Sequence, residues 1–84
     1  MELNKCDRFY IWCRIHRYNE LTQLLATAAS EQTAEFYQGL RESELWKISL
    51  RAQLSTDLSP TQSLNDEQWN RAIAFIEQFQ GGQQ

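Results

Sequence analysis

The stretch SLNDEQWNRAIAFIEQFQGG, residues 63–82, carries the strongest structural signal in the chain. Asn65 is a good helix N-cap, and Gln68, three positions on, can return a hydrogen bond to the backbone of Asn65, which makes a capping box. One apolar stripe with helical spacing follows, formed by Trp69, Ala72, Ile73, Ile76 and Phe79. The pattern predicts a helix over residues 66–80.

Both ends of this helix carry further signals. Leu64 before the cap and Trp69 at the fourth helical position form a hydrophobic staple, which fixes the angle at which the chain enters the helix. Gly81 suits a helix end. The Gly- and Gln-rich tail 81–84 is expected to fray, as chain ends commonly do.

The composition extends the helical prediction to the whole chain. The 84 residues include no valine, one proline and three glycines, which are too few β-branched and turn residues for a sheet. Residues that favour helix (Ala, Leu, Glu, Gln and Arg) are abundant. A chain this short forms one domain with a modest core. We therefore predict a single all-α, bundle-like domain over residues 1–80, with three to four helices.

The N-terminal third shows two apolar faces rather than one. A break at HRYN, residues 16–19, with Asn19 capping a second helix, would reconcile the two faces. This reasoning predicts separate helices over 4–16 and 19–29.

The middle segment is apolar around most of its circumference. Ser30 is a good cap, so we expect a helix over 31–54. This helix either has neighbours on several sides or bends near residues 39–43. The polar stretch that follows holds the only proline, Pro60, and is the expected loop, with Ser59 able to cap a short turn there.

The stretch CDRFYIWCRIHRY, residues 6–18, concentrates metal-binding and nucleophilic residue types. On a helix, Cys6 and Cys13 lie about 10.5 Å apart along the axis. One zinc ion cannot hold both, because its sulfur ligands lie about 2.3 Å away, and a disulfide joins Cα atoms at most about 7 Å apart. We expect two free thiols that serve as small apolar core residues beside Phe9 and Tyr10.

Catalytic chemistry has little support in the sequence. His16 is the only histidine, and Cys13, one helical turn earlier, is its only candidate nucleophile. No glycine precedes Gly39, so no glycine-rich loop accompanies the pair. The many carboxylates are expected on solvated helix surfaces. The prediction is a protein that is not an enzyme, with no catalytic residue, no cofactor and no metal.

One pattern favours a binding role. Lys5, Arg8, Trp12 and His16 recur at spacings of 3, 4 and 4 and so form one stripe along a helix. Trp and Arg are common anchors of protein interfaces. The alternative is that Trp12 packs beneath a neighbouring helix and the cations are ordinary surface residues. Trp46 joins the predicted partner-binding set, because a core this small should leave Trp12 or Trp46 partly exposed or in an interface.

Charge and hydropathy limit the partners. The net charge is −3 and the pI is about 5.0, whereas free nucleic-acid binders usually have a high pI. No apolar run approaches the roughly 18–20 residues of a membrane span, and the N-terminus lacks the order of a signal peptide. We expect a cytoplasmic adaptor or regulator that docks through a helix face to another protein or to a second copy as a homodimer. Nucleic acid and membranes are disfavoured.

A gene-regulatory accessory protein acting at or near DNA is the alternative, and it rests on a resemblance. KCDRFY, an Asn-Glu-Leu helix start, AEFYQGL and ELWKISL follow one another in an order similar to that of the Hha/YmoA family of small helical modulators, which bind nucleoid-structuring proteins and tune gene silencing. The matching positions are Lys5, Asp7, Leu21, Phe36, Tyr37 and Leu45. The chain departs from the family at residues 41–43, Arg-Glu-Ser in place of Asp-His-Arg, and in its longer tail from Pro60 onward.

Overall fold

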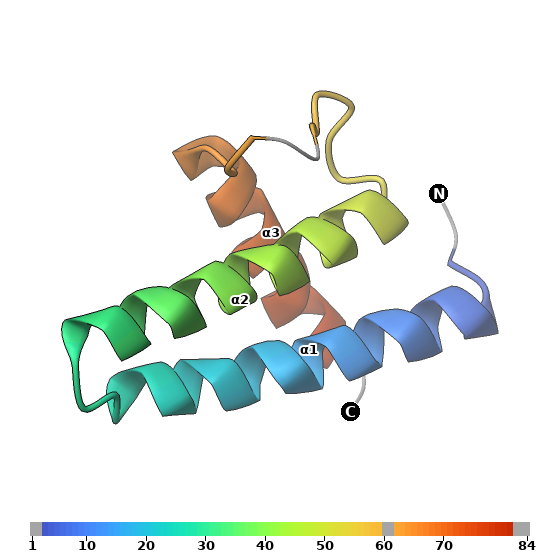
Figure 1. Cartoon of the computed structure of the whole chain (residues 1–84). Coiled ribbons are helices and arrows are strands. Elements are labelled where there is room, and N and C mark those ends of the chain that lie inside the picture. The colour runs from blue at the N-terminus through green and yellow to red at the C-terminus, as the bar shows by residue number, and fades with distance from the viewer. Residues whose placement is uncertain (1–2, 60–61, 82–84) are drawn as a thin grey trace.

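Three α-helices make up the fold in the computed structural model, which describes residues 3–59 and 62–81. They are α1, Lys5–Ala26, α2, Glu31–Arg51, and α3, Asp66–Gly81. Helices α1 and α2 run antiparallel and side by side, and α3 crosses behind both of them (Figure 1). The predicted all-α class is confirmed, and the described residues contain no strand.

The predicted division of the first segment into helices 4–16 and 19–29 is wrong, because the segment forms the single helix α1. It is one helix of 22 residues, and Asn19 is an exposed residue within it rather than a cap. The predicted division depends on the two apolar faces of this segment. A single helix accommodates both faces because only one of them is fully buried: Ile11, Ile15 and Tyr18 lie in the core, whereas Cys6, Phe9 and Leu24 on the other face are exposed.

Helix α2 begins as predicted and ends three residues early. The Ser30 hydroxyl oxygen accepts a hydrogen bond from the Thr33 N–H at 3.1 Å, which confirms the cap. The helix continues through residues 39–43 and stops at Arg51 rather than at residue 54. Gln53 adopts a left-handed φ of 56°, and the Leu54 N–H donates to the Ser49 carbonyl at 2.9 Å. This arrangement is the Schellman motif, which closes a helix.

The core lies where the three helices meet. Its buried residues are Ile11, Ile15 and Tyr18 of α1, Leu45 and Ile48 of α2, Ala72, Ile76 and Phe79 of α3, and Leu64 before α3. The expectation that both cysteines belong to the core was wrong: Cys6 is exposed and Cys13 is half-buried, although both are free thiols as predicted. The inward face of α1 passes through Ile15, and Cys13 lies about 160° around the helix from it.

Polar contacts fix how α1 and α2 pair. The buried Glu44 carboxylate lies 3.2 Å from the Arg14 guanidinium and 3.8 Å from the Lys47 ammonium. Arg41 donates a hydrogen bond to the Tyr18 hydroxyl at 2.9 Å. Glu44 therefore departs from the predicted role of the glutamates as solvated surface residues. A buried charge is tolerated only when it is paired, so these contacts favour one register of the hairpin.

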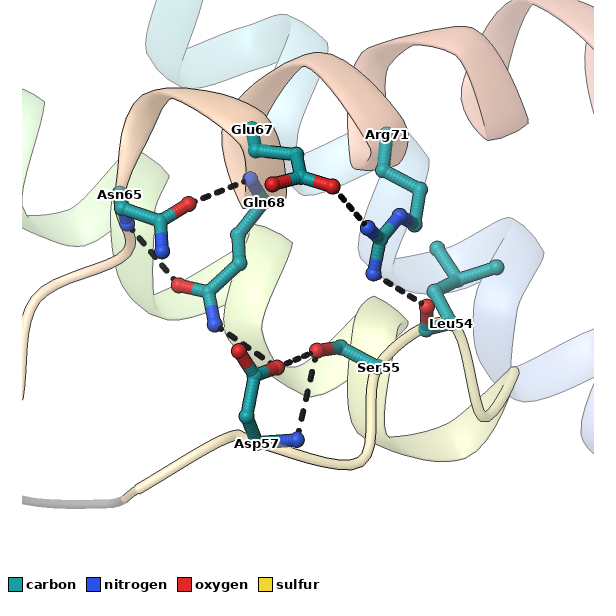
Figure 2. Close-up of polar contacts among 7 residues, drawn as sticks. All are labelled: Leu54, Ser55, Asp57, Asn65, Glu67, Gln68 and Arg71. Carbon is teal, nitrogen blue, oxygen red and sulfur yellow. Dashed lines mark hydrogen bonds and ion pairs between the residues drawn. The ribbon is translucent and has the colours of Figure 1, made fainter.

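The capping box of α3 is confirmed. The Asn65 N–H donates to Gln68 Oε1 at 2.9 Å, and the Gln68 N–H donates to Asn65 Oδ1 at 2.8 Å (Figure 2). Trp69 packs against the core with Leu64 nearby in the same cluster. The helix extends to Gly81, one residue beyond its predicted end and the first residue of the predicted tail. The rest of that tail, 82–84, and Pro60 lie outside the described residues.

The loop between α2 and α3 is tied to the first turns of α3. Gln68 Nε2 donates to Asp57 Oδ1 at 3.2 Å, and the Ser55 hydroxyl donates to the same carboxylate (Figure 2). Arg71 donates to the Leu54 carbonyl at 2.9 Å. Gln68 therefore links the helix cap to the loop.

Asp57 makes the stability of this loop depend on pH. The pKa of Asp57 lies below its ordinary value because Ser55 and Gln68 donate hydrogen bonds to the carboxylate, with smaller contributions from its own backbone N–H and from the Arg71 charge. Since folding lowers this pKa, the stabilisation is present above the unfolded pKa of about 3.9 and is lost as the pH falls through the folded value.

We expect Asp57→Asn to lower the urea midpoint near neutral pH, and the difference from the wild type to shrink as the pH is lowered from about 5 toward about 2. Urea unfolding followed by circular dichroism at several pH values measures this difference. Midpoints that stay equally far apart over the whole range would show that the Asp57 charge does not support the loop.

Candidate functional site

The predicted stripe lies on the outer surface of α1. Lys5, Arg8 and His16 are exposed, and the Trp12 side chain is 45% exposed. Phe9 lies beside them and is 68% exposed. We call these five residues the cationic–aromatic face. All of them lie within residues 5–16 of α1, so one rigid helix holds them at fixed spacing.

Ring contacts order the aromatic part of this face. The Phe9 and Trp12 ring centroids are 6.3 Å apart and the rings are nearly parallel, at 21°. The His16 ring meets Trp12 edge-on at a centroid distance of 4.1 Å. The Arg8 guanidinium lies over the Phe79 ring of α3 at 5.1 Å. These contacts already restrict the rotamers of the side chains. Less conformational entropy is therefore lost when a partner binds them.

Three pockets adjoin along this face. One of about 400 Å³ is lined by Lys5, Arg8, Phe9 and Trp12. A second, of about 270 Å³, shares Arg8 and is otherwise lined by Leu3, Phe75, Gln78 and Phe79. A third, of about 140 Å³, shares Trp12 and is otherwise lined by Ile15, His16, Asn19, Phe79 and Gln80. The surface lined by these pockets therefore extends from α1 onto the C-terminal half of α3.

Phe9 is the site residue that the sequence prediction misses. The prediction puts it in the core with Cys6, Tyr10 and Cys13, and the structure exposes it. Its spacing carries the signal, since it lies four residues after Lys5 and three before Trp12 and so borders the stripe. An aromatic residue is more often buried than exposed, which is why sequence reasoning favours the core.

Trp46 is not part of this surface. It is half-buried on α2 and lines a separate pocket of about 250 Å³ with Gly39, Glu42, Ser43, Gln62 and Leu64. The described residues that line this pocket include none of Lys5, Arg8, Trp12 and His16. The indole N–H of Trp46 is buried and has no hydrogen-bond partner within the described part of the chain. The predicted partner-binding residues thus fall into two places.

The described residues form neither a bonded Cys13–His16 pair nor a metal-binding cluster. No hydrogen bond joins Cys13 to His16 in the part of the chain that the structure describes, and the His16 ring contacts Trp12 instead. Among residues 3–59 and 62–81, no three His, Cys, Asp or Glu side chains are grouped so that they could hold a metal ion. None of the described helices combines the length and apolar character needed to cross a membrane.

No protein-family model, curated protein or solved structure matches the chain. The resemblance to the Hha/YmoA family therefore rests only on the residues that carry it, among them Lys5, Asp7 and the Phe36–Tyr37 pair.

Proposed function

We propose that this protein is a non-enzymatic helical interaction module, an adaptor or regulator that binds another protein through the cationic–aromatic face. The observation that carries the proposal is the exposure of Phe9 and Trp12 side by side, at 68% and 45%, in one pocket with the cations Lys5 and Arg8. Large apolar side chains that gather on a surface favour a partner that removes them from water.

The residue types of the face support the same role. Trp and Arg dominate the binding energy of many protein interfaces, and Trp contributes a large apolar area with few rotatable bonds. A docking face also needs to be rigid, and this one lies on a single helix held by contacts to α2 and α3. The described residues of this face include no nucleophile with a base in hydrogen-bond reach, which covalent catalysis would need.

The cytoplasm is the location that we propose for this module. The free thiols Cys6 and Cys13 are consistent with it, since Cys6 is exposed and would be open to oxidation elsewhere.

Replacing Trp12 with alanine is expected to weaken partner binding by about 2 kcal/mol, or roughly 30-fold in Kd. The partner would be captured from a lysate of the native host with tagged wild-type protein, identified by mass spectrometry and then purified for titration. Because Trp12 is only partly buried, circular dichroism should show a stability loss well below that of a core substitution.

Phe36→Ala is the matched control for this experiment. Phe36 is an aromatic residue on α2 with a similar exposure, 62%, and it contacts Tyr37 rather than the cationic–aromatic face. A partner that still binds Phe36→Ala and loses Trp12→Ala supports the proposal. A partner that binds Trp12→Ala as tightly as the wild type would place the site elsewhere on the molecule.

A further inference from the structure

We infer that the partner presents an acidic segment with a large apolar side chain between its carboxylates, and that this partner is a different protein rather than a second copy of this chain. The inference rests on the proposed function and adds the chemistry of the partner. Three observations carry it: the pairing of the cations, the residues that line the pockets and the placement of the chain's own acidic groups.

The two permanent cations of the cationic–aromatic face have no acidic partner among the described residues. Of the eight Lys and Arg residues in the chain, five form ion pairs with Asp or Glu, namely Arg14, Arg17, Lys47, Arg51 and Arg71. Arg41 instead donates hydrogen bonds to Gln38 and Tyr18. Within residues 3–59 and 62–81, Lys5 and Arg8 are the two cations that remain, and both line the same pocket. Their charge is available to a partner.

The pockets around these two cations hold no counter-charge in the part of the chain that the structure describes. None of the three pockets that adjoin at Arg8 and Trp12 has an Asp or Glu among its described lining residues. The pocket beside Trp46 includes Glu42, and the pocket beside the loop includes Asp57. A surface of one sign next to exposed rings is complementary to carboxylates that flank an apolar group.

A second copy of the chain does not supply that complement by two-fold symmetry. When two cationic–aromatic faces meet about a two-fold axis, none of the five residues on either face is acidic, and Glu20, one turn after His16, already pairs with Arg17. The exposed glutamates Glu31 and Glu35 lie on α2, not on this face. A contact between α1 of one copy and α2 of another joins two different patches, and unless the same contact is repeated about a two-fold axis it extends into rings or filaments.

A nucleic acid is also a poorer match than an acidic protein segment. Proteins that hold a phosphate backbone neutralise many phosphates with clustered Lys and Arg residues. The cationic–aromatic face has two permanent cations, on a chain whose net charge is −3. A short acidic segment needs only a few counter-charges and one apolar contact, which is what this face provides.

The test is a selection from random sequences, so it does not require the partner to be identified first. The full chain is used to select binders from a phage-displayed library of random short peptides, and the enriched peptides are synthesised and titrated by fluorescence anisotropy. The enriched peptides should carry Asp or Glu around one large apolar residue. Arg8→Glu should weaken them roughly tenfold or more, and Trp12→Ala should abolish the enrichment.

Arg17→Glu is the matched control, because it makes the same charge change on the same helix. Arg17 pairs with Glu20 and is not among the residues that line the three pockets of the face. It should leave the peptide affinities within about twofold of the wild type. Since Arg8 also contacts Phe79, Lys5→Glu provides a second reversal at an exposed residue with no such contact in the described part of the chain, and thermal melts confirm that each variant is folded.

The outcomes separate this inference from the proposed function. Neutral apolar peptides that need Trp12 but tolerate both Arg8→Glu and Lys5→Glu would overturn the acidic partner and leave the docking face intact. A selection that yields no Trp12-dependent peptide would overturn both. A stable dimer in sedimentation that Trp12→Ala dissociates, or salt-sensitive binding to a short DNA duplex that Arg8→Glu removes, would assign the face to a second copy or to nucleic acid.

Discussion

Ile48→Ala is expected to lower the free energy of unfolding by about 2–5 kcal/mol, the range for a large-to-small change in a packed core. Ile48 is 0% exposed and belongs to the cluster in which all three helices meet. The whole stability of a small domain is about 5–15 kcal/mol, and a chain of this size is expected near the lower end. Urea unfolding followed by circular dichroism should therefore show a large shift in midpoint.

Leu50→Ala is the control for this substitution, on the same helix and two residues away. Leu50 is 53% exposed, so removing its side chain should change the stability by no more than about 0.5 kcal/mol. If Ile48→Ala and Leu50→Ala had equal effects, the core would not lie where α1, α2 and α3 meet.

Trp69→Ala is expected to cost about 3 kcal/mol, the low end of the range for Trp-to-Ala changes, because Trp69 is only partly buried. The substitution removes both a core contact and one side of the predicted staple with Leu64, so α3 loses part of its attachment to the hairpin. The measurement is again the free energy of unfolding in urea.

The neighbouring exposed residue supplies the comparison for Trp69. Asn70→Ala should leave the free energy of unfolding nearly unchanged. Trp69→Phe should keep most of the wild-type stability because an apolar ring remains in place. A loss below about 1 kcal/mol in Trp69→Ala would mean that the first turns of α3 are held mainly by the contacts of Gln68 and Arg71 to the loop.

The features of the fold that could be predicted are those encoded by residues close together in the sequence. The caps at Ser30 and Asn65 join groups three residues apart, so their hydrogen bonds follow from local sequence and a helical backbone. The residues of the apolar stripe of α3 repeat at helical spacing, and they all face the α1–α2 hairpin. Local chemistry of this kind was sufficient for the all-α class and for the bounds of α3.

The candidate site was predicted in part for the same reason. Lys5, Arg8, Trp12 and His16 share one stripe of any helix that contains them, wherever that helix lies. Their exposure did not follow from that pattern, and neither did the inclusion of Phe9. The segment has apolar residues on two faces, so its periodicity alone did not show which face meets the rest of the protein.

The remaining features depend on contacts between distant parts of the chain. Glu44 is buried because Arg14, 30 residues earlier, approaches it from α1. Ile11 and Ile15 face inward, and Cys6 and Phe9 face outward, because α2 and α3 cover one side of α1 and leave the other open. Helix α1 runs unbroken past Asn19 because only one of its two apolar faces needs to be buried, so the helix does not have to change face. Periodicity places residues on faces of a helix, and the packing of the other helices decides which of those faces are buried and which are left for a partner.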